Sequence, residues 1–441
     1  MSEPRNVIFL PRRMRPLHAR RSSVVSVLDV GSTKVCCMIA KLIPQEDGEL
    51  MPGRSHAIQI MGYGYQVSRG IKSGVVVDMD LAEQAIRRAV DKAERMAGVM
   101  VESLLVNVSC GRLNSEILSA KVNVNGESVS EADIQRVLAA GSAHNAQDGR
   151  AVLHALPISY GLDGSPGIRD PRGMMGRQLS VDMQVVGAEV PPVRNLELCI
   201  ERGHLQVEAM VATPYAAGLS TLVGDETELG VACIDFGGGT TTLSIFFGGH
   251  MVHLDAVAVG GNHVTMDIAR GLSTRMHEAE RIKTLHGSAL PSAADEQEIM
   301  SVPPVDAEGD LPHQVSKADL TRVIRPRVEE ILELVRDRLV ASGFAGRVGK
   351  RVVLTGGGSQ LTGLSETARR ILGRNVRLGR PLGISGLPSQ AKGPAFSTAA
   401  GLLIYPQVAQ IEQFEPQVHR TPWGGTGNYL ARVGQWLRES F

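Results

Sequence analysis

Short apolar runs interrupted by glycine-rich polar turns dominate the pattern of hydrophobic and polar positions along this chain. Residues 231–247, VACIDFGGGTTTLSIFF, predict an apolar strand, a tight polar turn and a second apolar strand. The same pattern occurs at residues 24–40, VVSVLDVGSTKVCCMIA, and an apolar run enters a third glycine turn at residues 352–358, VVLTGGG. Three such turns, far apart in the sequence, favour two lobes that close on one ligand. The two paired turns also indicate an internal duplication.

The segments between these turns alternate predicted strands and helices, which indicates an α/β protein. We expect strands at residues 58–67, 104–108, 205–212 and 252–259. We expect helices at residues 81–97, 191–203, 320–339 and 396–405. Pro326 is expected to interrupt the third helix, and residues 287–315 are expected to be irregular and exposed.

Residues 109–188 show a different pattern, in which short strands surround one helix. The strands are predicted at residues 117–124, 152–160 and 179–186, and Ser130 and Asp133 fit a capping box at the start of the helix. This pattern predicts a small α+β unit that is inserted into a larger lobe. It carries no nucleotide motif.

The end of the chain predicts a mobile linker, residues 406–427, followed by an amphipathic helix, residues 428–441. One arc of this helix carries apolar side chains with an arginine at each border. The residues we expect at a membrane surface are Tyr429, Leu430, Arg432, Val433, Trp436, Leu437, Arg438 and Phe441. A helix docked on the protein's own surface is the alternative, but the long linker and the terminal position favour a membrane-surface anchor.

The charge balance, the cysteines and the length of the apolar runs give further information about the kind of protein. The 441 residues contain 46 basic and 46 acidic side chains, and this balance gives no argument for nucleic acid as a partner. Five cysteines without CxxC spacing indicate buried thiols in a reducing compartment. No apolar run approaches the roughly 20 residues that span a bilayer. The arginine-rich residues 1–22 lack the apolar core of a secretory signal, so we expect a flexible basic arm.

The turn at Gly237, Gly238 and Gly239 has the composition of a phosphate cradle. Glycines allow backbone N–H groups to converge on an anion, and the hydroxyls of Thr240 and Thr241 can donate to phosphate oxygens. Asp235, just before the turn, is placed to hold a divalent ion through water. An ordinary glycine-rich hairpin is the alternative, and this stretch alone leaves both open.

Further polar groups fit a nucleotide. The first hairpin has an equivalent set, namely Asp29, Gly31, Ser32, Thr33 and Lys34. Gly261 and Asn262, at a predicted helix start, offer N–H groups to phosphate. Glu280 and Lys283 share one helix face, where they form either a solvated ion pair or the acceptor and donor that a ribose or adenine edge requires.

In order, the segments LDVGSTKV, CIDFGGGTT and VLTGGGSQLTG resemble the two phosphate turns and the adenosine turn of the actin-type ATPase superfamily, which includes heat-shock chaperones and sugar kinases. Together with the insertion, the stretches HALPISYGLDG and ERIKTLHGSAL and the terminal helix, they make the chain similar to the FtsA family of bacterial division proteins over residues 24–441. The resemblance implies an actin-like, two-lobed α/β fold with an inserted α+β subdomain of the SHS2 type and a C-terminal amphipathic helix.

The resemblance also implies a division of the chain into segments. Lobe 1 would comprise residues 23–108 and 189–228, with the insert at 109–188 and a returning helix at 393–405. Lobe 2 would comprise a core at 229–263 and 341–392 and an outer part at 264–340.

The ligand that the resemblance implies is ATP with Mg²⁺. Lys34 would offer charge to the β-phosphate, and Asp29 and Asp235 would hold Mg²⁺ mostly through water. Glu280 and Lys283 fall where the family contacts ribose and base. The adenine side would be lined by Gly356, Gly357, Gly358 and Gln360.

Hydrolysis requires a polar group that orients the attacking water. Heat-shock chaperones use a glutamate followed by proline, and Thr213 stands at that place in the stretch VATPYAAG. A threonine can position water but is a poor base, so we expect slow turnover at most. The alternative functions are those of a kinase or a chaperone ATPase of the same superfamily. A kinase would require a carboxylate base, which the stretch VATPYAAG does not supply. A chaperone would require a substrate-binding domain after residue 405, where too few residues follow.

The resemblance implies the partners as well. The expected partners are the C-terminal peptide of FtsZ, docked on the outer part of lobe 2, further copies of the chain in an actin-like filament, and other division proteins at the insert. The implied location is the cytoplasmic side of the bacterial inner membrane at the division septum.

Overall fold

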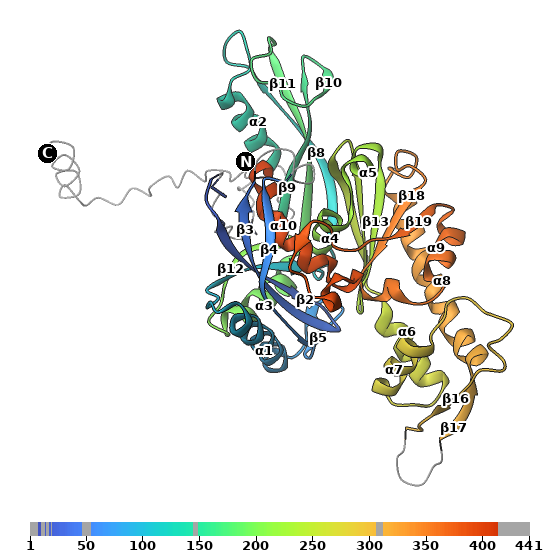
Figure 1. The fold of residues 1–441 in the computed structure, drawn as a ribbon. Helices are drawn as coiled ribbons and strands as arrows, with labels where there is room; N and C mark the ends of the chain where they lie inside the picture. The colour runs from blue at the N-terminus through green and yellow to red at the C-terminus, as the bar shows by residue number, and fades with distance from the viewer. Residues whose placement is uncertain are drawn as a thin grey trace.

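The computed structural model describes residues 8–9, 14, 17–18, 20–45, 54–143, 149–305 and 312–412. Two lobes with their own sheets lie side by side, and a third sheet projects from them as a separate unit (Figure 1). The predicted membrane helix at 428–441, and the linker beyond residue 412, lie outside the described residues.

The sheet of lobe 1 has the order β12-β7-β2-β3-β4-β20. Its strands are β2 (Ser23–Val30), β3 (Lys34–Pro44), β4 (His56–Val67), β7 (Ser103–Val108), β12 (Gln206–Ala212) and β20 (Ile384–Ser385). Strand β3 is antiparallel to both of its neighbours, β2 and β4, whereas β7 and β12 run parallel to β2. A short hairpin, β5 (Ile71–Lys72) and β6 (Val75–Val76), follows β4.

The sheet of lobe 2 repeats this arrangement with the order β15-β14-β13-β18-β19. Its strands are β13 (Val231–Phe236), β14 (Thr241–Phe247), β15 (His250–Val257), β18 (Arg351–Thr355) and β19 (Asn375–Leu378). Strands β13, β14 and β15 are antiparallel, and β18 and β19 run parallel to β13. This shared topology confirms the internal duplication that the two hairpins predicted.

The insert is an antiparallel sheet covered by one helix. Its strands are β8 (Asn114–Asn123), β9 (Arg150–Leu162), β10 (Ser165–Ile168) and β11 (Gln178–Glu189), and its helix is α2 (Glu131–Ala143). The predicted capping box forms, because the Asp133 N–H donates to Ser130 Oγ (3.3 Å) and the Ser130 N–H donates to the Asp133 carboxylate (2.9 Å).

The prediction of a flexible arm over residues 1–22 is wrong in part. Strand β1 (Ile8–Phe9) pairs in parallel with Ala151 and Val152 of β9. Leu17 also packs against the main core. The sequence analysis missed these two contacts, the pairing of β1 and the packing of Leu17. A strand of two residues is too short to give a periodic pattern.

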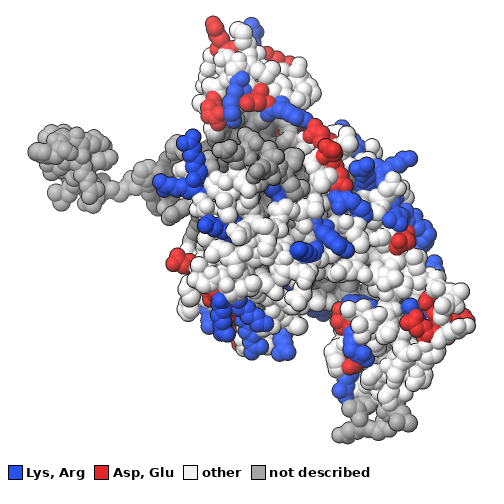
Figure 2. Space-filling model, in the orientation of Figure 1, with Lys and Arg blue, Asp and Glu red and all other residues white. Residues whose placement is uncertain are grey.

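The remaining helices surround the two large sheets. They are α1 (Met79–Ala97), α3 (Val190–Glu201), α4 (Thr213–Thr221), α5 (Gly224–Leu229), α6 (Gly261–Gly271), α7 (Met276–His286), α8 (Lys317–Ala341), α9 (Leu364–Leu372) and α10 (Ser397–Glu412). Helix α1 packs on β3 and β4, while α4 and α10 pack on each other between the two sheets. On the outward face of α1, basic side chains gather, as Figure 2 shows at the lower left.

Two predictions in the outer part of lobe 2 are wrong. Helix α8 continues through Pro326 without a break, because buried side chains such as Ile324 and Val328 hold both halves against the same core. Residues 287–315, expected to be irregular, contain β16 (Ile299–Val302), which pairs with β17 (His313–Ser316). These strands of four residues are too short to stand out in the pattern.

Helix α10 also runs further than predicted, since it passes through Pro406 to Glu412. Tyr405 and Ala409 on either side of the proline are fully buried, and the side-chain oxygen of Gln407 accepts the N–H groups of Ser55 (2.9 Å) and His56 (3.0 Å). These contacts outweigh the one backbone hydrogen bond that proline removes. All five cysteines are free and buried, as predicted. Within the described residues, no helix is both long and apolar enough to cross a membrane.

Candidate functional site

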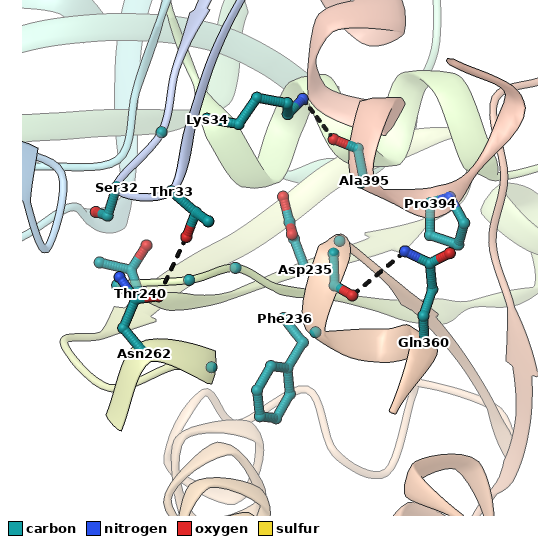
Figure 3. A pocket seen from close by; sticks show the side chains of 18 of the residues that line it. Ser32, Thr33, Lys34, Asp235, Phe236, Thr240, Asn262, Gln360, Pro394 and Ala395 are labelled. Atoms are coloured by element: carbon teal, nitrogen blue, oxygen red, sulfur yellow. Dashed lines mark hydrogen bonds between the residues drawn. The ribbon is translucent and has the colours of Figure 1, made fainter. Parts of the chain in front are cut away.

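A cleft of about 580 Å³ lies between the two lobes, and glycine turns from both lobes line it (Figure 3). With one exception, the residues that the sequence suggested for nucleotide binding or for positioning water lie on its wall. These residues are Asp29, Gly31, Ser32, Thr33, Lys34, Thr213, Asp235, Gly237, Gly238, Gly239, Thr240, Gly261, Asn262, Glu280, Lys283, Gly356, Gly357, Gly358 and Gln360. The exception is Thr241, whose hydroxyl donates to the Val259 carbonyl at 2.8 Å and not into the cleft. The structure therefore brings three distant turns to one cavity.

The two hairpin turns have the same backbone geometry. The Gly31 N–H donates to the Lys34 carbonyl at 2.9 Å, and the Gly237 N–H donates to the Thr240 carbonyl at 3.0 Å. The turns face each other across the cleft, where the Thr33 hydroxyl donates to the Asn262 side-chain oxygen at 3.2 Å (Figure 3). This bond links the first turn of lobe 1 to the helix α6 of lobe 2.

Contrary to what the sequence led us to expect, Gly261 and Asn262 do not offer their N–H groups to phosphate. Their N–H groups donate to the carbonyls of Gly237 (2.9 Å) and Gly238 (2.7 Å). Both groups are therefore used to fasten the start of α6 to the second turn, and they do not face the cleft as anion donors. The glycine turn gains its fixed shape from this attachment.

Lys34 lies at the inner end of the cleft, between the lobes. Its ammonium donates to the Ala395 carbonyl (2.8 Å), lies 3.4 Å from the Asp29 carboxylate and sits over the Phe396 ring. Burial raises the pKa of Asp29, and the charge of Lys34 opposes that rise. The pair thus places one cation next to one buried carboxyl group.

Asp235, at the end of β13, is the second buried carboxyl group. Burial raises its pKa to about 6, while the hydrogen bond from the Thr398 hydroxyl (3.0 Å) lowers it and the charge of Asp29 raises it. Its side chain also limits the third turn, because a Cβ built on Gly356 would lie 2.1 Å from Asp235 Oδ1. Gly356 has φ of +84°, so only glycine fits here on both counts.

The raised pKa of Asp235 predicts a pH-dependent stability. The folded protein binds more protons than the unfolded chain between about pH 4 and pH 6, so the free energy of unfolding falls as pH rises through this window. Asp235→Asn removes the cost of ionisation and keeps an acceptor for Thr398. We expect the variant to be more stable at pH 7.5, by up to about 3 kcal/mol, with a gain that shrinks toward pH 4.

Urea denaturation at pH 4.5, 6 and 7.5 measures this gain. Asp91→Asn, at an exposed position on α1, is the matched control and should change stability little at each pH. An Asp235→Asn protein that is less stable than the unchanged protein at pH 7.5 would contradict the prediction.

Glu280 and Lys283 on α7 form a bonded pair at the mouth of the cleft. The Lys283 ammonium lies 2.6 Å from the Glu280 carboxylate, 2.8 Å from the Thr265 hydroxyl and 3.2 Å from the Gly261 carbonyl. Lys283 is mostly buried, whereas the Glu280 side chain is about half exposed. The pair presents one acceptor and one donor that a ligand in the cleft can share.

The third turn closes the opposite wall. Gly357–Gln360 form one turn of 3-10 helix after β18, and the Gln360 amide donates to the Gly357 carbonyl at 3.4 Å. Together with Pro394 and Ala395, these residues line this side of the cleft, and Gln360 adds a polar side chain to it (Figure 3).

Sequence reasoning missed several polar residues of the cleft, among them Asn107, Thr242 and Thr398. Asn107 is buried, and its side-chain oxygen accepts the Val30 N–H (2.6 Å) while its amide donates to the Thr213 hydroxyl (3.1 Å). A signal was present, because Asn107 is a polar residue inside the apolar run LLVNV. Thr398 gave no such signal, since threonine is ordinary near a helix start.

The strand before Thr213 is also held by the insert. The Ala212 N–H donates to Nε2 of the fully buried His154 on β9, at 2.9 Å. The His154 ring makes edge contacts with Tyr215 of α4 and Tyr405 of α10. The insert, the helix that begins at Thr213 and the last described helix therefore meet at one side chain.

Two duplicated lobes around a cleft lined by glycine turns define the actin-like ATPase fold. Solved structures that are similar in fold include a PilM–PilN type IV pilus biogenesis complex (TM-score 0.60, 15% identity, 87% of this chain and 98% of the other). They also include MreB5 of Spiroplasma citri bound to ADP (TM-score 0.50, 14% identity, 90% of this chain and 100% of the other). Identities this low establish the fold alone.

The chain belongs to the FtsA family of cell division proteins. It is 58% identical to cell division protein FtsA of Agrobacterium fabrum, with 97% of both chains covered, and 31% identical to that of Escherichia coli K12, with 96% and 100% covered. A family model described as cell division protein FtsA matches residues 232–401. A second, described as the SHS2 domain inserted in FtsA, matches residues 110–187, which confirms the expected type of insert.

Proposed function

We propose that this chain is an ATP-binding, actin-like membrane adaptor of bacterial cell division. It polymerises on the cytoplasmic face of the inner membrane at the septum, tethers FtsZ filaments there and helps to recruit later division proteins. The observation that carries this proposal is the convergence of all three glycine turns, Lys34 and two buried carboxyl groups on one cleft in a member of the FtsA family.

The cleft fits ATP in size and chemistry. Its volume and its glycine turns suit a triphosphate, Lys34 suits the phosphate charge, and Glu280 with Lys283 suits a ribose or base edge. MreB5, which is similar in fold, was solved bound to ADP, and this supports a nucleotide as the ligand. Asp29 and Asp235 would hold Mg²⁺ through water, and the ion would neutralise charge on the phosphates.

ATP acts here mainly as a conformational ligand. The first turn is joined to lobe 2 by the bond of Thr33 to Asn262 of α6, and α6 is itself fastened to the second turn, so a ligand bound to both turns favours the closed arrangement. Thr213 offers a hydroxyl and no strong base, so hydrolysis is slow.

The outer part of lobe 2 offers a surface for the FtsZ peptide. A hollow of about 600 Å³ lies between the end of α6, strand β17 and the start of α8. Its wall combines apolar groups, such as Leu272 and Val323, with Arg322, whose guanidinium pairs with Asp319 at 2.6 Å and would have to share its donors with an acidic peptide. Such a surface suits a short peptide that carries both apolar and acidic side chains.

Polymerisation and membrane attachment support each other in this proposal. The helix at 428–441 carries only two arginines and one glutamate, so a single copy binds lipid weakly. A filament presents many such helices at once and raises the avidity by orders of magnitude. Closure on ATP that favours the filament would then favour the membrane as well.

Vesicle pelleting tests the membrane part of this function. A chain that ends at Gly427 should lose at least nine-tenths of its ATP-dependent pelleting with vesicles of phosphatidylethanolamine and phosphatidylglycerol. Trp436→Glu should have a similar effect, because it places a charge on the apolar arc of the helix. Purified FtsZ should pellet with the vesicles only when the full chain is present.

Gln435→Glu is the matched control, since it adds the same charge one position away, on the polar side of the same helix. Equal losses for Trp436→Glu and Gln435→Glu would contradict insertion of the apolar arc. Full pelleting of the shortened chain would overturn the adaptor function itself.

A further inference from the structure

The insert is attached to both lobes, although its chain leaves and re-enters lobe 1 alone. On the side of lobe 1, His154 of β9 accepts the Ala212 N–H at 2.9 Å. On the side of lobe 2, strand β15 lies against β8, β9 and β11, and β8 runs beside the lobe 2 sheet (Figure 1). Val186 of the insert and Leu254 of β15 belong to one buried core. The insert therefore connects the two lobes at a place that is separate from the cleft.

One serine of the insert binds the backbone at the edge of the lobe 2 sheet. The Ser115 hydroxyl on β8 donates to the Leu254 carbonyl at 2.9 Å and accepts the Leu254 N–H at 2.8 Å. Strands β8 and β15 are both at the edges of their sheets, so neither of these backbone groups of Leu254 is used for pairing with β14. Ser115 therefore satisfies two buried backbone groups that the sheet of lobe 2 leaves open.

An ion pair joins the insert to a second element of lobe 2. Arg169, which follows β10, lies 2.5 Å from the carboxylate of Glu228 on α5. Both side chains are more than half exposed, so this pair contributes little by itself. It extends the contact between the insert and lobe 2 beyond the single strand β15.

The junction between the insert and β15 also contains an unpaired polar group. Gln184 on β11 is fully buried, and neither atom of its amide has a hydrogen-bond partner among the described residues. Gln184 lies two residues from Val186, the cross-strand partner of Ser115, so its side chain is on the face that Ser115 presents to lobe 2. Separation of the insert from β15 would hydrate this amide, which offsets part of the cost of separation. The junction therefore opens at a lower cost than an apolar core of the same area.

The bond of Thr33 to Asn262 across the cleft and the bonds of Ser115 to Leu254 exist in the same arrangement of the lobes. We propose that the insert acts as a brace, a connection that holds both lobes in this arrangement, and that its attachment to β15 raises the affinity of the cleft for ATP. This inference rests on the proposed function, in which ATP contacts turns from both lobes. Such coupling is reciprocal, so ATP in turn tightens the junction, and a protein that draws the insert away from β15 weakens the binding of ATP.

Ser115→Ala tests the brace in the full-length protein. The variant leaves both backbone groups of Leu254 without their partner, and we expect the Kd for a fluorescent ATP analogue to rise about fivefold to twentyfold. Ser115→Thr keeps the hydroxyl and should bind the analogue within about twofold of the unchanged protein. Hydrogen exchange followed by mass spectrometry should show that ATP slows the exchange of β15 in the unchanged protein, and slows it less in Ser115→Ala.

Ser119→Ala is the matched control. Ser119 lies on the same face of β8, but its hydroxyl donates to Asp182 within the insert, at 2.5 Å. This variant should leave the Kd for the analogue and the exchange of β15 unchanged.

Three outcomes would overturn this inference while ATP binding stands. They are an unchanged Kd in a folded Ser115→Ala protein, equal losses in Ser115→Ala and Ser119→Ala, and exchange of β15 in the unchanged protein that does not respond to ATP. The third is measured without any variant, so it decides the matter even where Ser115→Ala does not fold. Failure of the unchanged protein to bind the analogue would overturn both this inference and the proposed function.

Discussion

Gly238→Asp should weaken ATP binding by roughly a hundredfold or more. The side chain would enter the space between the two turns, since a Cβ at this position would lie 1.9 Å from Thr33 Oγ1. Its carboxylate would stand next to the phosphates, and like charges about 4 Å apart repel by about 4 kcal/mol near a protein surface. Titration with a fluorescent ATP analogue measures the loss, and far-ultraviolet circular dichroism reports whether the fold persists.

Two further variants separate the causes of this loss. Gly238→Ala adds the Cβ without the charge and should bind ATP with an intermediate affinity. Gly346→Asp adds the same charge in a loop, where a Cβ meets no atom within 4 Å, and should bind ATP normally. Retained affinity in Gly238→Asp would mean that the nucleotide lies elsewhere.

Gly401→Ala should destabilise the whole protein by about 3 kcal/mol or more. Gly401 lies on α10 where this helix crosses α4, and an added Cβ would lie 1.7 Å from the Ala216 carbonyl oxygen. Alanine gains about 1 kcal/mol over glycine from helix propensity, but a clash with backbone cannot be relieved by a rotamer change. The two helices would have to separate, which opens the core between the lobes.

The free energy of unfolding in urea measures this effect. Gly346→Ala is the control, because the same methyl group meets open space there, and it should leave stability within about 0.5 kcal/mol. A Gly401→Ala protein as stable as the unchanged protein would show that α4 and α10 are not packed as closely as described.

The residues of the candidate site were easier to predict from the sequence than the bounds of the helices and strands around it. Glycine turns such as Gly237–Thr240 are local features, since their residues alone determine which backbone angles are allowed, and all of them reached one cleft as expected. The two large sheets also share one topology, in agreement with the internal duplication that the paired hairpins indicate.

The features that could not be predicted from the sequence depend on contacts between distant segments. Helix α10 passes through Pro406 because Gln407 binds the backbone at Ser55 and His56, some 350 positions earlier. The N–H groups of Gly261 and Asn262 donate to carbonyls of the second glycine turn, and no local sequence pattern reveals these hydrogen bonds. Thr242 is the last of three adjacent threonines, and only the structure shows that it lines the cleft together with Thr240, whereas the Thr241 hydroxyl donates to the Val259 carbonyl.

The hydrogen bond of His154 with Ala212 joins strand β9 of the insert to the residue that precedes Thr213. The ring of His154 also contacts Tyr405 of α10. A displacement of either the insert or α10 therefore changes the surroundings of Thr213 in the cleft wall, so these two outlying parts of the chain are mechanically connected to its centre.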